Sequence, residues 1–361
     1  MKKIFSLLIF SINTFSGFSQ TIENQKKTNE QAFLEFIQSN PDKASLQIIR
    51  NDTVAVSYHA ERKMPLASTV KIIIAIEYAK QVAAKLQNEN ELIKETELNK
   101  YYIPNTDGGA HPAWKNFLSK KNIDISNGFP LKEIVKGMII FSSNANAEFL
   151  MDKLGLNNIN KTYETLIQQH DPIYPIVSAL FVANQIKLSG DTLLNKLRSL
   201  DNNIYIKYCN QIHQQLKSDT TGNFKKSLPF LSFEIQKIWS DRLPGSNAKE
   251  YAALMQKIVN RKYFTDKVQI VLDEILQWPM ELNPANKTVY KQLGMKGGST
   301  AFVLTLAGFA EDLHNNKTTL CVMFNNLTIA EGSFLQQRLN SFIATAFSNE
   351  IFIAQLKKEL H

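Results

Sequence analysis

The sequence contains few residues of the kinds that bind metals or form disulfides. It has only two cysteines, Cys209 and Cys321, and because Cys321 lies in a strand-like run the pair does not indicate a disulfide framework. The six histidines show no HExxH motif or other ligand spacing. A glycine-rich loop followed by a helix, the usual phosphate cradle, is also missing. We therefore expect neither a metal nor a cofactor.

Long apolar runs are scarce as well. Residues 1–20 combine two lysines, an apolar run over 4–15 and a small-residue patch, a pattern typical of a signal peptide cleaved near Ser19 or Gln20. The alternative, a membrane anchor, needs about 20 apolar residues, and this run is shorter and interrupted by polar residues. No later segment is long enough to span a bilayer. We expect a periplasmic or secreted protein without stable membrane insertion after cleavage.

The positive charge is not concentrated in one place. The net charge is +8, but the lysines are scattered and are not clustered with aromatic residues. This pattern predicts a solvated basic surface and no nucleic-acid partner. We also expect the protein to be a monomer.

Strand-like runs open and close the chain, and a long helical middle separates them. This order predicts an α+β fold, in which helices flank one antiparallel sheet and an all-helical region is added. Residues 21–30 look like a loose leader. The remaining expected elements are a hairpin over 45–57, helices over 131–154, 248–260, 266–277 and 334–347, and strands over 288–293, 301–309 and 318–324.

The most informative stretch is Ser68-Thr69-Val70-Lys71, followed by an apolar run that predicts a buried helix. Residues i and i+3 share a helix face, so the lysine can lie beside the serine hydroxyl. A serine becomes a good nucleophile when a neighbouring base takes its proton, and burial can lower the pKa of a lysine enough for that role. The same spacing recurs at Ser246 and Lys249, where we interpret Ser246 or Asn247 as a helix N-cap. The spacing alone therefore does not identify a catalytic serine, and other motifs have to support it.

Two further motifs contain polar residues that could belong to the same site as Ser68. Ser142-Ser143-Asn144 interrupts an apolar helical stretch, and its side chains can serve one site only if the chain turns there; the alternative is a cap or polar residues within a helix. The stretch from Lys296 to Thr300 has Gly-Gly entering a strand-like run. This indicates close backbone approach, or alternatively a bulge or turn.

Together the three motifs resemble the penicillin-recognising serine enzymes, namely class A β-lactamases and the penicillin-binding transpeptidases and carboxypeptidases. Ser68-Thr69-Val70-Lys71 matches their serine-x-x-lysine motif. Ser143 stands in the aspartate place of serine-aspartate-asparagine, and Gly297 in the threonine place of lysine-threonine-glycine. The resemblance implies a β-lactamase-like serine hydrolase domain over 21–361, with a helical insertion at about 188–241 that either decorates the fold or shapes the pocket.

The resemblance also implies roles for individual residues. Ser68 would be the nucleophile, Lys71 the proton acceptor and Ser142 a proton relay to the leaving nitrogen. Asn144 would bind the substrate amide, and Lys296 would add positive charge near Lys71 and attract a substrate carboxylate.

Backbone N–H groups of Ser68 and Ser299 would form the oxyanion hole. Gly298, Ser299 and Thr300 would contact substrate, and Ser299 or Thr300 would have to replace the hydroxyl that Gly297 lacks.

One family feature is missing from the expected place. Class A enzymes release the acyl group with a loop glutamate, but residues 165–233 contain no glutamate. Asp171 is the carboxylate nearest the right place, and beside Pro172 we interpret it as a turn residue. His170 is a possible base, although a single loop histidine is usually exposed.

We therefore expect an exported acyl-enzyme-forming hydrolase acting on β-lactams or related amides and esters. The alternatives are a D-alanyl-D-alanine carboxypeptidase-type enzyme, with a peptidoglycan-like substrate, or a non-turnover penicillin-binding or sensor protein.

Overall fold

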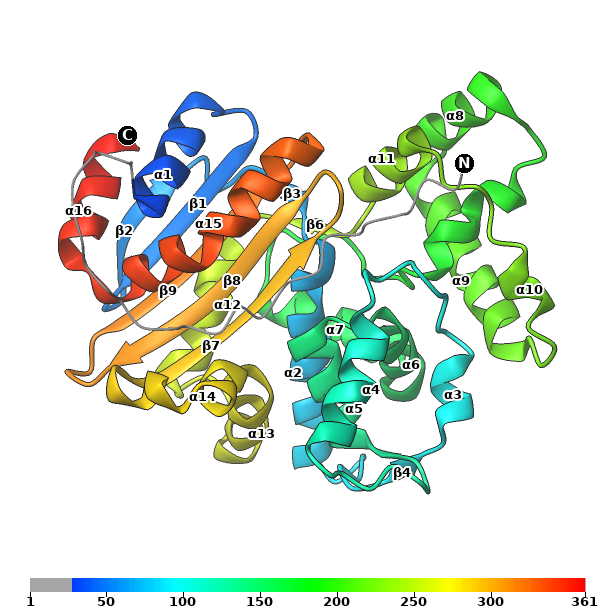
Figure 1. The fold of residues 1–361 in the computed structure, drawn as a ribbon, viewed down its shortest axis with the longest axis horizontal. Coiled ribbons are helices and arrows are strands. Elements are labelled where there is room, and N and C mark those ends of the chain that lie inside the picture. Colours follow the sequence, from blue (N-terminus) through cyan, green and yellow to red (C-terminus); the bar gives the residue numbers. More distant parts are fainter. Residues whose placement is uncertain (1–27, 361) are drawn as a thin grey trace.

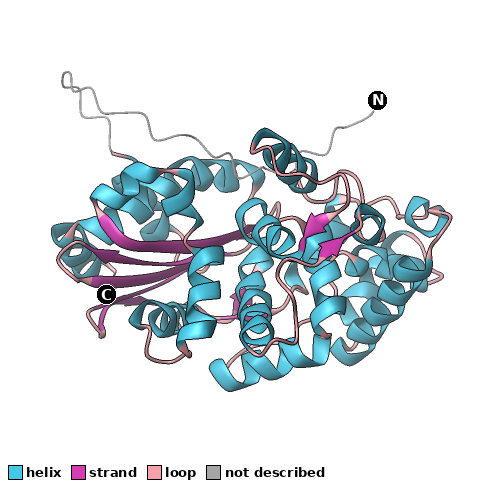
Figure 2. Cartoon of the chain, turned by 90° about the horizontal axis from the view of Figure 1, so that it is seen from below, coloured by secondary structure: helices cyan, strands magenta, loops and turns pink. Residues whose placement is uncertain are grey.

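A five-stranded antiparallel sheet forms one end of the molecule, and helices fill the other (Figure 1 and Figure 2). The computed structural model describes residues 28–360, so the predicted signal peptide lies outside the described residues. The strands, in their order across the sheet, are β2 (Thr53–Tyr58), β1 (Ala44–Arg50), β9 (Lys317–Phe324), β8 (Leu304–Asp312) and β7 (Tyr290–Ser299). The predicted α+β class is confirmed.

Both faces of the sheet are covered, which explains why its inner strands are apolar without interruption. In β8, Leu306 belongs to the cluster on one face while Ala307 belongs to the cluster on the other. The first face packs on the terminal helices, which are α1 (Asn29–Ser39), α15 (Ile329–Ser348) and α16 (Glu350–Glu359). The second face packs on α12 (Ala248–Asn260), which contacts β1, β8 and β9.

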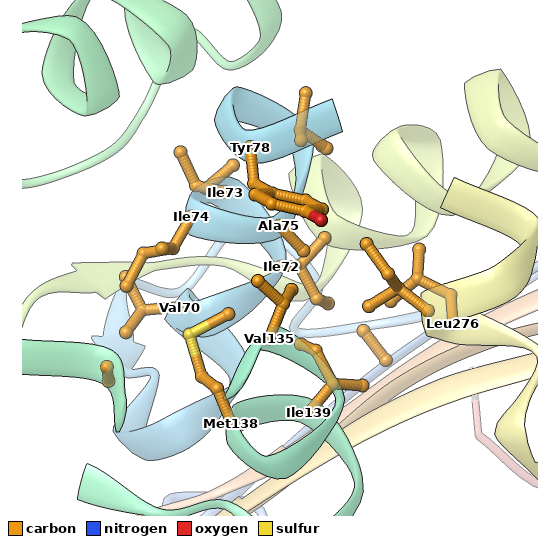
Figure 3. Packing of buried hydrophobic residues seen from close by; sticks show 14 of the residues in the cluster. Val70, Ile72, Ile73, Ile74, Ala75, Tyr78, Val135, Met138, Ile139 and Leu276 are labelled. Carbon is orange, nitrogen blue, oxygen red and sulfur yellow. The ribbon is translucent and has the colours of Figure 1, made fainter. Parts of the chain in front are cut away.

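The apolar helix after Ser68 is α2 (Lys71–Ala83), and it lies at the centre of the helical part. Ile72, Ile73 and Ile74 are each fully buried, so no side of this stretch of the helix faces solvent. Figure 3 shows Ile72 on the side of Leu276, and Ile73 and Ile74 on the opposite side of the helix. The predicted buried helix is confirmed. The elements around it are α5 (Leu131–Lys136), α6 (Asn144–Leu154), α7 (Leu156–Leu166) and α13 (Asp266–Leu276).

Shorter elements complete the helical part and its junction with the sheet. They are α3 (Glu95–Asn99), α4 (Ala110–Lys120), α14 (Trp278–Leu282), a 3-10 turn over Pro284–Thr288, and the two-residue strands β3 (Met64–Pro65), β4 (Leu92–Ile93), β5 (Phe129–Pro130) and β6 (Gly245–Ser246). β3 pairs with β6, and β4 pairs with β5, both antiparallel.

The predicted middle segment consists of helices that share a core of their own. A 3-10 stretch over Ser178–Gln185 leads into α8 (Gly190–Ser199), α9 (Asn202–Ser218), α10 (Asn223–Lys226) and α11 (Phe233–Asp241). Their cluster includes Tyr205, Cys209, Ile212 and Leu216, all at most 2% exposed. The apolar residues of α9 recur at helical spacing on one face, which is why the segment is polar overall and yet folds compactly.

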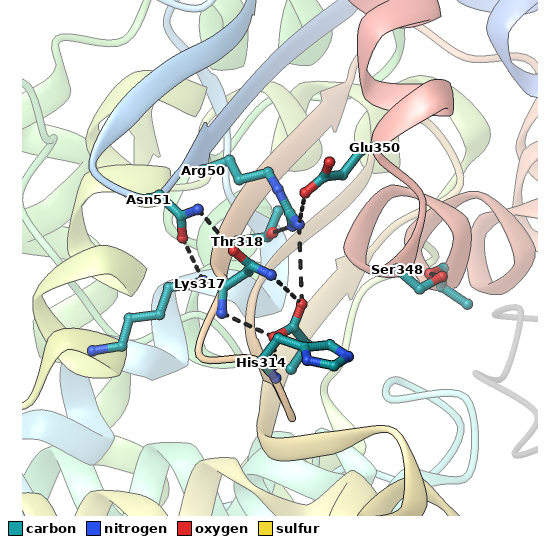
Figure 4. Close-up of polar contacts among 10 residues, drawn as sticks. Arg50, Asn51, His314, Lys317, Thr318, Ser348 and Glu350 are labelled. Carbon is teal, nitrogen blue, oxygen red and sulfur yellow. Dashed lines mark hydrogen bonds and ion pairs between the residues drawn. The ribbon is translucent and has the colours of Figure 1, made fainter.

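Polar contacts tie together the hairpin turns at the far end of the sheet (Figure 4). Arg50 donates to Thr318 Oγ1 at 2.7 Å and to Glu350 Oε1 at 2.6 Å. Asn51 donates to Asn316 Oδ1 at 3.0 Å and accepts from the Lys317 backbone N–H at 2.9 Å. These bonds join the β1–β2 turn to the β8–β9 turn, and one of them reaches α16.

The structure corrects several predicted boundaries. Helix α1 begins at Asn29, within the stretch 21–30 that we expected to be a loose leader, and continues to Ser39. The terminal helix begins at Ile329 instead of 334 and is followed by α16. Both differences arise at the sheet face, because α1 and α15 pack against each other over it. The strand expected over 288–293 continues to Ser299, and the next begins at Leu304 instead of 301. Glycines in this stretch obscured the continuation.

Within the described residues, no helix combines the length and apolarity needed to cross a membrane. Cys209 and Cys321 are buried free thiols in separate clusters. No group of three or more His, Cys, Asp or Glu side chains in residues 28–360 is arranged to hold a metal ion.

Candidate active site

Ser68 lies in a tight turn immediately before α2. Residues Ala67–Val70 form one 3-10 turn, and Lys71 is the first residue of the α-helix. Ala67 has φ of 46°, in the left-handed region that alanine rarely adopts, so the backbone is strained directly before the serine. The turn places Lys71 Nζ 3.0 Å from Ser68 Oγ. The contact predicted from the spacing is therefore present.

The chain turns sharply at the second motif. Such a turn was required for the side chains of this motif to serve one site. A π-helical turn over Gly137–Phe141 ends at Ser142, which has φ of 69°, and α6 begins two residues later. Ser143 caps α6 by accepting from the Asn146 N–H at 3.2 Å. Because the helix is interrupted here, Ser142 and Asn144 both lie against Lys71. Its Nζ lies 2.7 Å from Ser142 O, 3.3 Å from Ser142 Oγ and 2.8 Å from Asn144 Oδ1.

The third motif enters the site from β7. Lys296 Nζ donates to Ser142 Oγ at 3.0 Å and to Gly297 O at 2.7 Å. Gly298 lies so close to the start of α2 that a Cβ built on it would be 2.5 Å from Ser68 N and 2.8 Å from Leu66 O. The expectation of close backbone approach thus describes Gly298 correctly, but the motif belongs to the end of β7 and does not enter the following strand.

Burial sets the charge of the two lysines. Lys71 is fully buried, and burial lowers its pKa from 10.5 to about 7, although the carboxylates of Asp107 and Glu148 partly oppose the shift. Burial, together with the charge of Lys71, also holds the pKa of Lys296 well below its usual value. Ser142 Oγ accepts from both amines, which leaves its own proton free to donate elsewhere.

These groups border a cavity of about 270 Å³ between the sheet and the helical part. Of the residues predicted for the site, all but Lys71 line it; Lys71 lies beneath Ser68, in contact with it. The predicted residues that line the cavity are Ser68, Ser142, Asn144, Lys296, Gly298, Ser299 and Thr300.

The cavity is also lined by residues that were not predicted for the site from the sequence, among them Asp107, Ile176, Trp239 and Trp278. Asp107 lies in the loop before α4, and Trp278 follows α13 as the first residue of α14. Ile176 lies on the loop after α7, and Trp239 comes from α11 in the middle segment. No local pattern marks these residues, because each reaches the cavity from a different part of the chain. Trp239 Nε1 donates to Ile176 O at 3.3 Å, so the middle segment contacts the loop beside the serine.

Two hydroxyls near the site are already used in structural bonds. Ser143 Oγ, besides capping α6, lies 2.9 Å from His111 Nδ1. Thr300 Oγ1 lies 2.6 Å from Ser240 Oγ and accepts from the N–H groups of Phe302 and Val303 at 3.0 and 3.1 Å. Thr300 is therefore poorly placed to replace the hydroxyl that Gly297 lacks, and Ser299 is the candidate that remains.

The loop after α7 brings no carboxylate to the cavity. Asp171 forms an ion pair with Lys63 at 2.6 Å and accepts from the Gly245 N–H at 3.0 Å, which agrees with its interpretation as a turn residue. His170 is not exposed as expected. It is partly buried, lies 3.0 Å from the Tyr251 hydroxyl, and burial lowers its pKa to about 4.

The loop is instead held in place by a buried carboxylate. Glu148 of α6, 1% exposed, accepts from the N–H groups of Val177 and Ser178 at 3.0 and 3.1 Å. These bonds fix the residues directly after Ile176, which lines the cavity. The loop therefore presents an apolar residue to the cavity and no carboxylate.

The fold and this constellation define the class of β-lactamase-like α+β hydrolases. The chain matches the model of the β-lactamase enzyme family over residues 29–279 and belongs to that family. No curated protein matched the chain.

Solved structures agree with the fold. A β-lactamase from Chitinophaga pinensis DSM 2588 has 13% identity and a TM-score of 0.51, with 88% of this chain and 100% of that chain covered. A β-lactamase from Sphaerobacter thermophilus DSM 20745 has 14% identity and a TM-score of 0.51, covering 87% and 95%. A point mutant of PBP-A, in an acyl-enzyme complex with penicillin G, has 14% identity and a TM-score of 0.50, covering 88% and 95%.

Proposed function

We propose that the protein is an exported serine hydrolase in which Ser68 forms an acyl-enzyme with β-lactams or related amides and esters. The observation that carries this proposal is the contact between Ser68 Oγ and Lys71 Nζ at 3.0 Å, made to a buried amine whose pKa is about 7. A neutral amine at this place can take the hydroxyl proton as Ser68 Oγ attacks the carbonyl carbon.

The neighbouring groups fit the remaining steps. Ser142 passes its proton to the leaving nitrogen and takes from Lys71 the proton that Lys71 received from Ser68, since Ser142 Oγ accepts a hydrogen bond from Lys71 Nζ and another from Lys296 Nζ. Asn144 Oδ1 accepts from Lys71, which directs its amide NH₂ toward a substrate carbonyl. The backbone N–H groups of Ser68 and Ser299 stabilise the oxyanion; removal of one such donor typically costs about 3 to 4 kcal/mol.

Release of the acyl group is the weak step of this mechanism. Hydrolysis needs a base to activate water, and the family's glutamate has no counterpart on the loop, where Ile176 faces the cavity instead. This apolar wall favours a second candidate function, a penicillin-binding or sensor protein that is acylated and released slowly. A D-alanyl-D-alanine carboxypeptidase-type activity uses the same acylation centre and remains the alternative for the substrate.

Intact-mass spectrometry over time tests acylation and release together. We expect an adduct of one penicillin on the wild-type protein, no adduct on Ser68→Ala, and slow return of the free mass after excess penicillin is removed. Ser246→Ala is the matched control, because Ser246 has the same spacing to a lysine but lies in β6, just before α12, where its hydroxyl donates to Gln169 O at 2.6 Å. Labelling that persists in Ser68→Ala would overturn the proposal.

A further inference from the structure

The cavity contains one carboxylate among its described lining residues, Asp107, and that carboxylate has no cationic partner. Asp107 Oδ1 accepts from the Gly109 N–H at 3.2 Å, and Oδ2 accepts from the His111 N–H at 3.0 Å. No lysine or arginine in residues 28–360 forms an ion pair with it. A carboxylate has about four acceptor positions, so these two bonds leave acceptor capacity on each oxygen.

The negative charge of Asp107 affects the pKa of Lys71, which contacts Ser68. Among the charges that oppose the lowered pKa of Lys71, Asp107 has the largest effect, ahead of Glu148. The side chain is partly exposed in the cavity that Ser68 also lines. A substrate attached at Ser68 can therefore extend to this carboxylate.

The same cavity has lost much of its capacity to hold an anion. Gly297 has no hydroxyl, Thr300 Oγ1 is engaged by Ser240 and by two backbone N–H groups, and Lys296 is buried and bonded to Ser142 and Gly297. No arginine among residues 28–360 lines the cavity. The charged and polar groups of this cavity therefore favour binding of a cation more than a cavity with the family's usual lysine-threonine-glycine motif would.

The remaining walls are apolar. Ile139, Ile176, Leu243, Trp239 and Trp278 surround the polar groups. In such surroundings a hydrogen bond between an ammonium and a carboxylate is stronger than in water, and an unpaired charge is costly. A ligand that carries an ammonium group next to an apolar group would fit both Asp107 and these apolar walls.

We propose that this cavity selects substrates whose acyl portion carries an ammonium group, which pairs with Asp107 while the adjoining apolar part packs against Trp239 and Ile176. This inference rests on the proposed acylation of Ser68 and adds to it the substrate class. Amides, lactams and esters of amino-substituted acyl groups belong to this class.

Ampicillin and penicillin G form a suitable pair of probes, because they differ by one amino group on the acyl side chain. The measured quantity is the ratio of their second-order acylation rate constants at pH 6.5, where an α-amine of ordinary pKa is mostly protonated. For the wild-type protein we expect acylation by ampicillin to be faster by about tenfold or more, as for a hydrogen bond to a charged group. In Asp107→Asn we expect the ratio to fall to within about twofold of one.

The ratio separates substrate pairing from the effect of Asp107 on Lys71, since a changed lysine pKa alters both rates alike. Asp124→Asn is the matched control: this exposed aspartate accepts from the Ser126 N–H at 2.9 Å outside the cavity. Its ratio is expected to equal that of the wild type. Asp107→Glu, which keeps the charge, is expected to retain a preference for ampicillin.

A wild-type ratio of one or less would overturn the inference without any variant, and so would a preference that Asp107→Asn leaves intact. In both cases Ser68 is still acylated and the proposed function stands. Absence of any adduct with either compound would overturn the proposed function and this inference with it.

Discussion

Acylation of Ser68 is expected to depend on pH with a midpoint near 7, because Lys71 acts only as the neutral amine. Burial lowers the Lys71 pKa from 10.5 to about 7. At about 1.4 kcal/mol per pKa unit this corresponds to about 5 kcal/mol of lost preference for the charged form. About half of the molecules then hold a neutral lysine at pH 7, against roughly one in three thousand for a lysine of ordinary pKa.

The sign follows from the role of the lysine. Protonation below pH 7 removes the base, so the acylation rate constant is expected to fall about tenfold per pH unit on the acid side. It reaches a plateau above about pH 8. The assay is the second-order rate of loss of the free mass with penicillin G, quenched at intervals between pH 5.5 and 9.

Lys71→Arg tests the assignment, because a guanidinium keeps the positive charge and does not deprotonate in this range. We expect acylation to fall by about 10² to 10⁴ and the rise with pH to disappear. Lys249→Arg is the matched control, since Lys249 has the same spacing after a serine but pairs with Glu61 at the surface. A flat wild-type profile, or an unchanged rate in Lys71→Arg, would refute the role of Lys71 as the base.

Three further substitutions have expected outcomes. Gly298→Ala places a Cβ 2.5 Å from Ser68 N and is expected to lower the acylation rate at least about tenfold by displacing β7 from the nucleophile, as measured with the same mass assay. Ser143→Ala removes the N-cap of α6 and is expected to lower the free energy of unfolding by about 1 kcal/mol in denaturant titrations; an unchanged midpoint and slope would contradict that role. Ile176→Glu introduces a carboxylate on the loop that faces the cavity and is expected to shorten the lifetime of the acyl-enzyme at least about tenfold. An equal lifetime would show that release is limited by something other than the missing base.

Much of the fold could be predicted from hydrophobic periodicity and from the spacing of nearby residues. The apolar run after Lys71 predicted a fully buried helix, and the strand-like pattern over 45–57 predicted the β1–β2 hairpin. Both depend on interactions between residues near one another in the chain. The boundary at Ser299 could not be predicted in this way, because β7 continues through Gly297 and Gly298 only by pairing with β8.

The sequence by itself determined which groups are available for chemistry: a serine with a lysine three residues on, a polar interruption of an apolar helix, and a lysine before two glycines. Only the tertiary structure decided that these groups meet, because the left-handed turn at Ser142 brings Ser142 and Asn144 to Lys71, and β7 brings Lys296 to the Ser142 hydroxyl. It also decided the rest of the cavity. Asp107, Ile176 and Trp239 come from three distant segments without local signatures, and their shared position depends on packing between helices far apart in the chain.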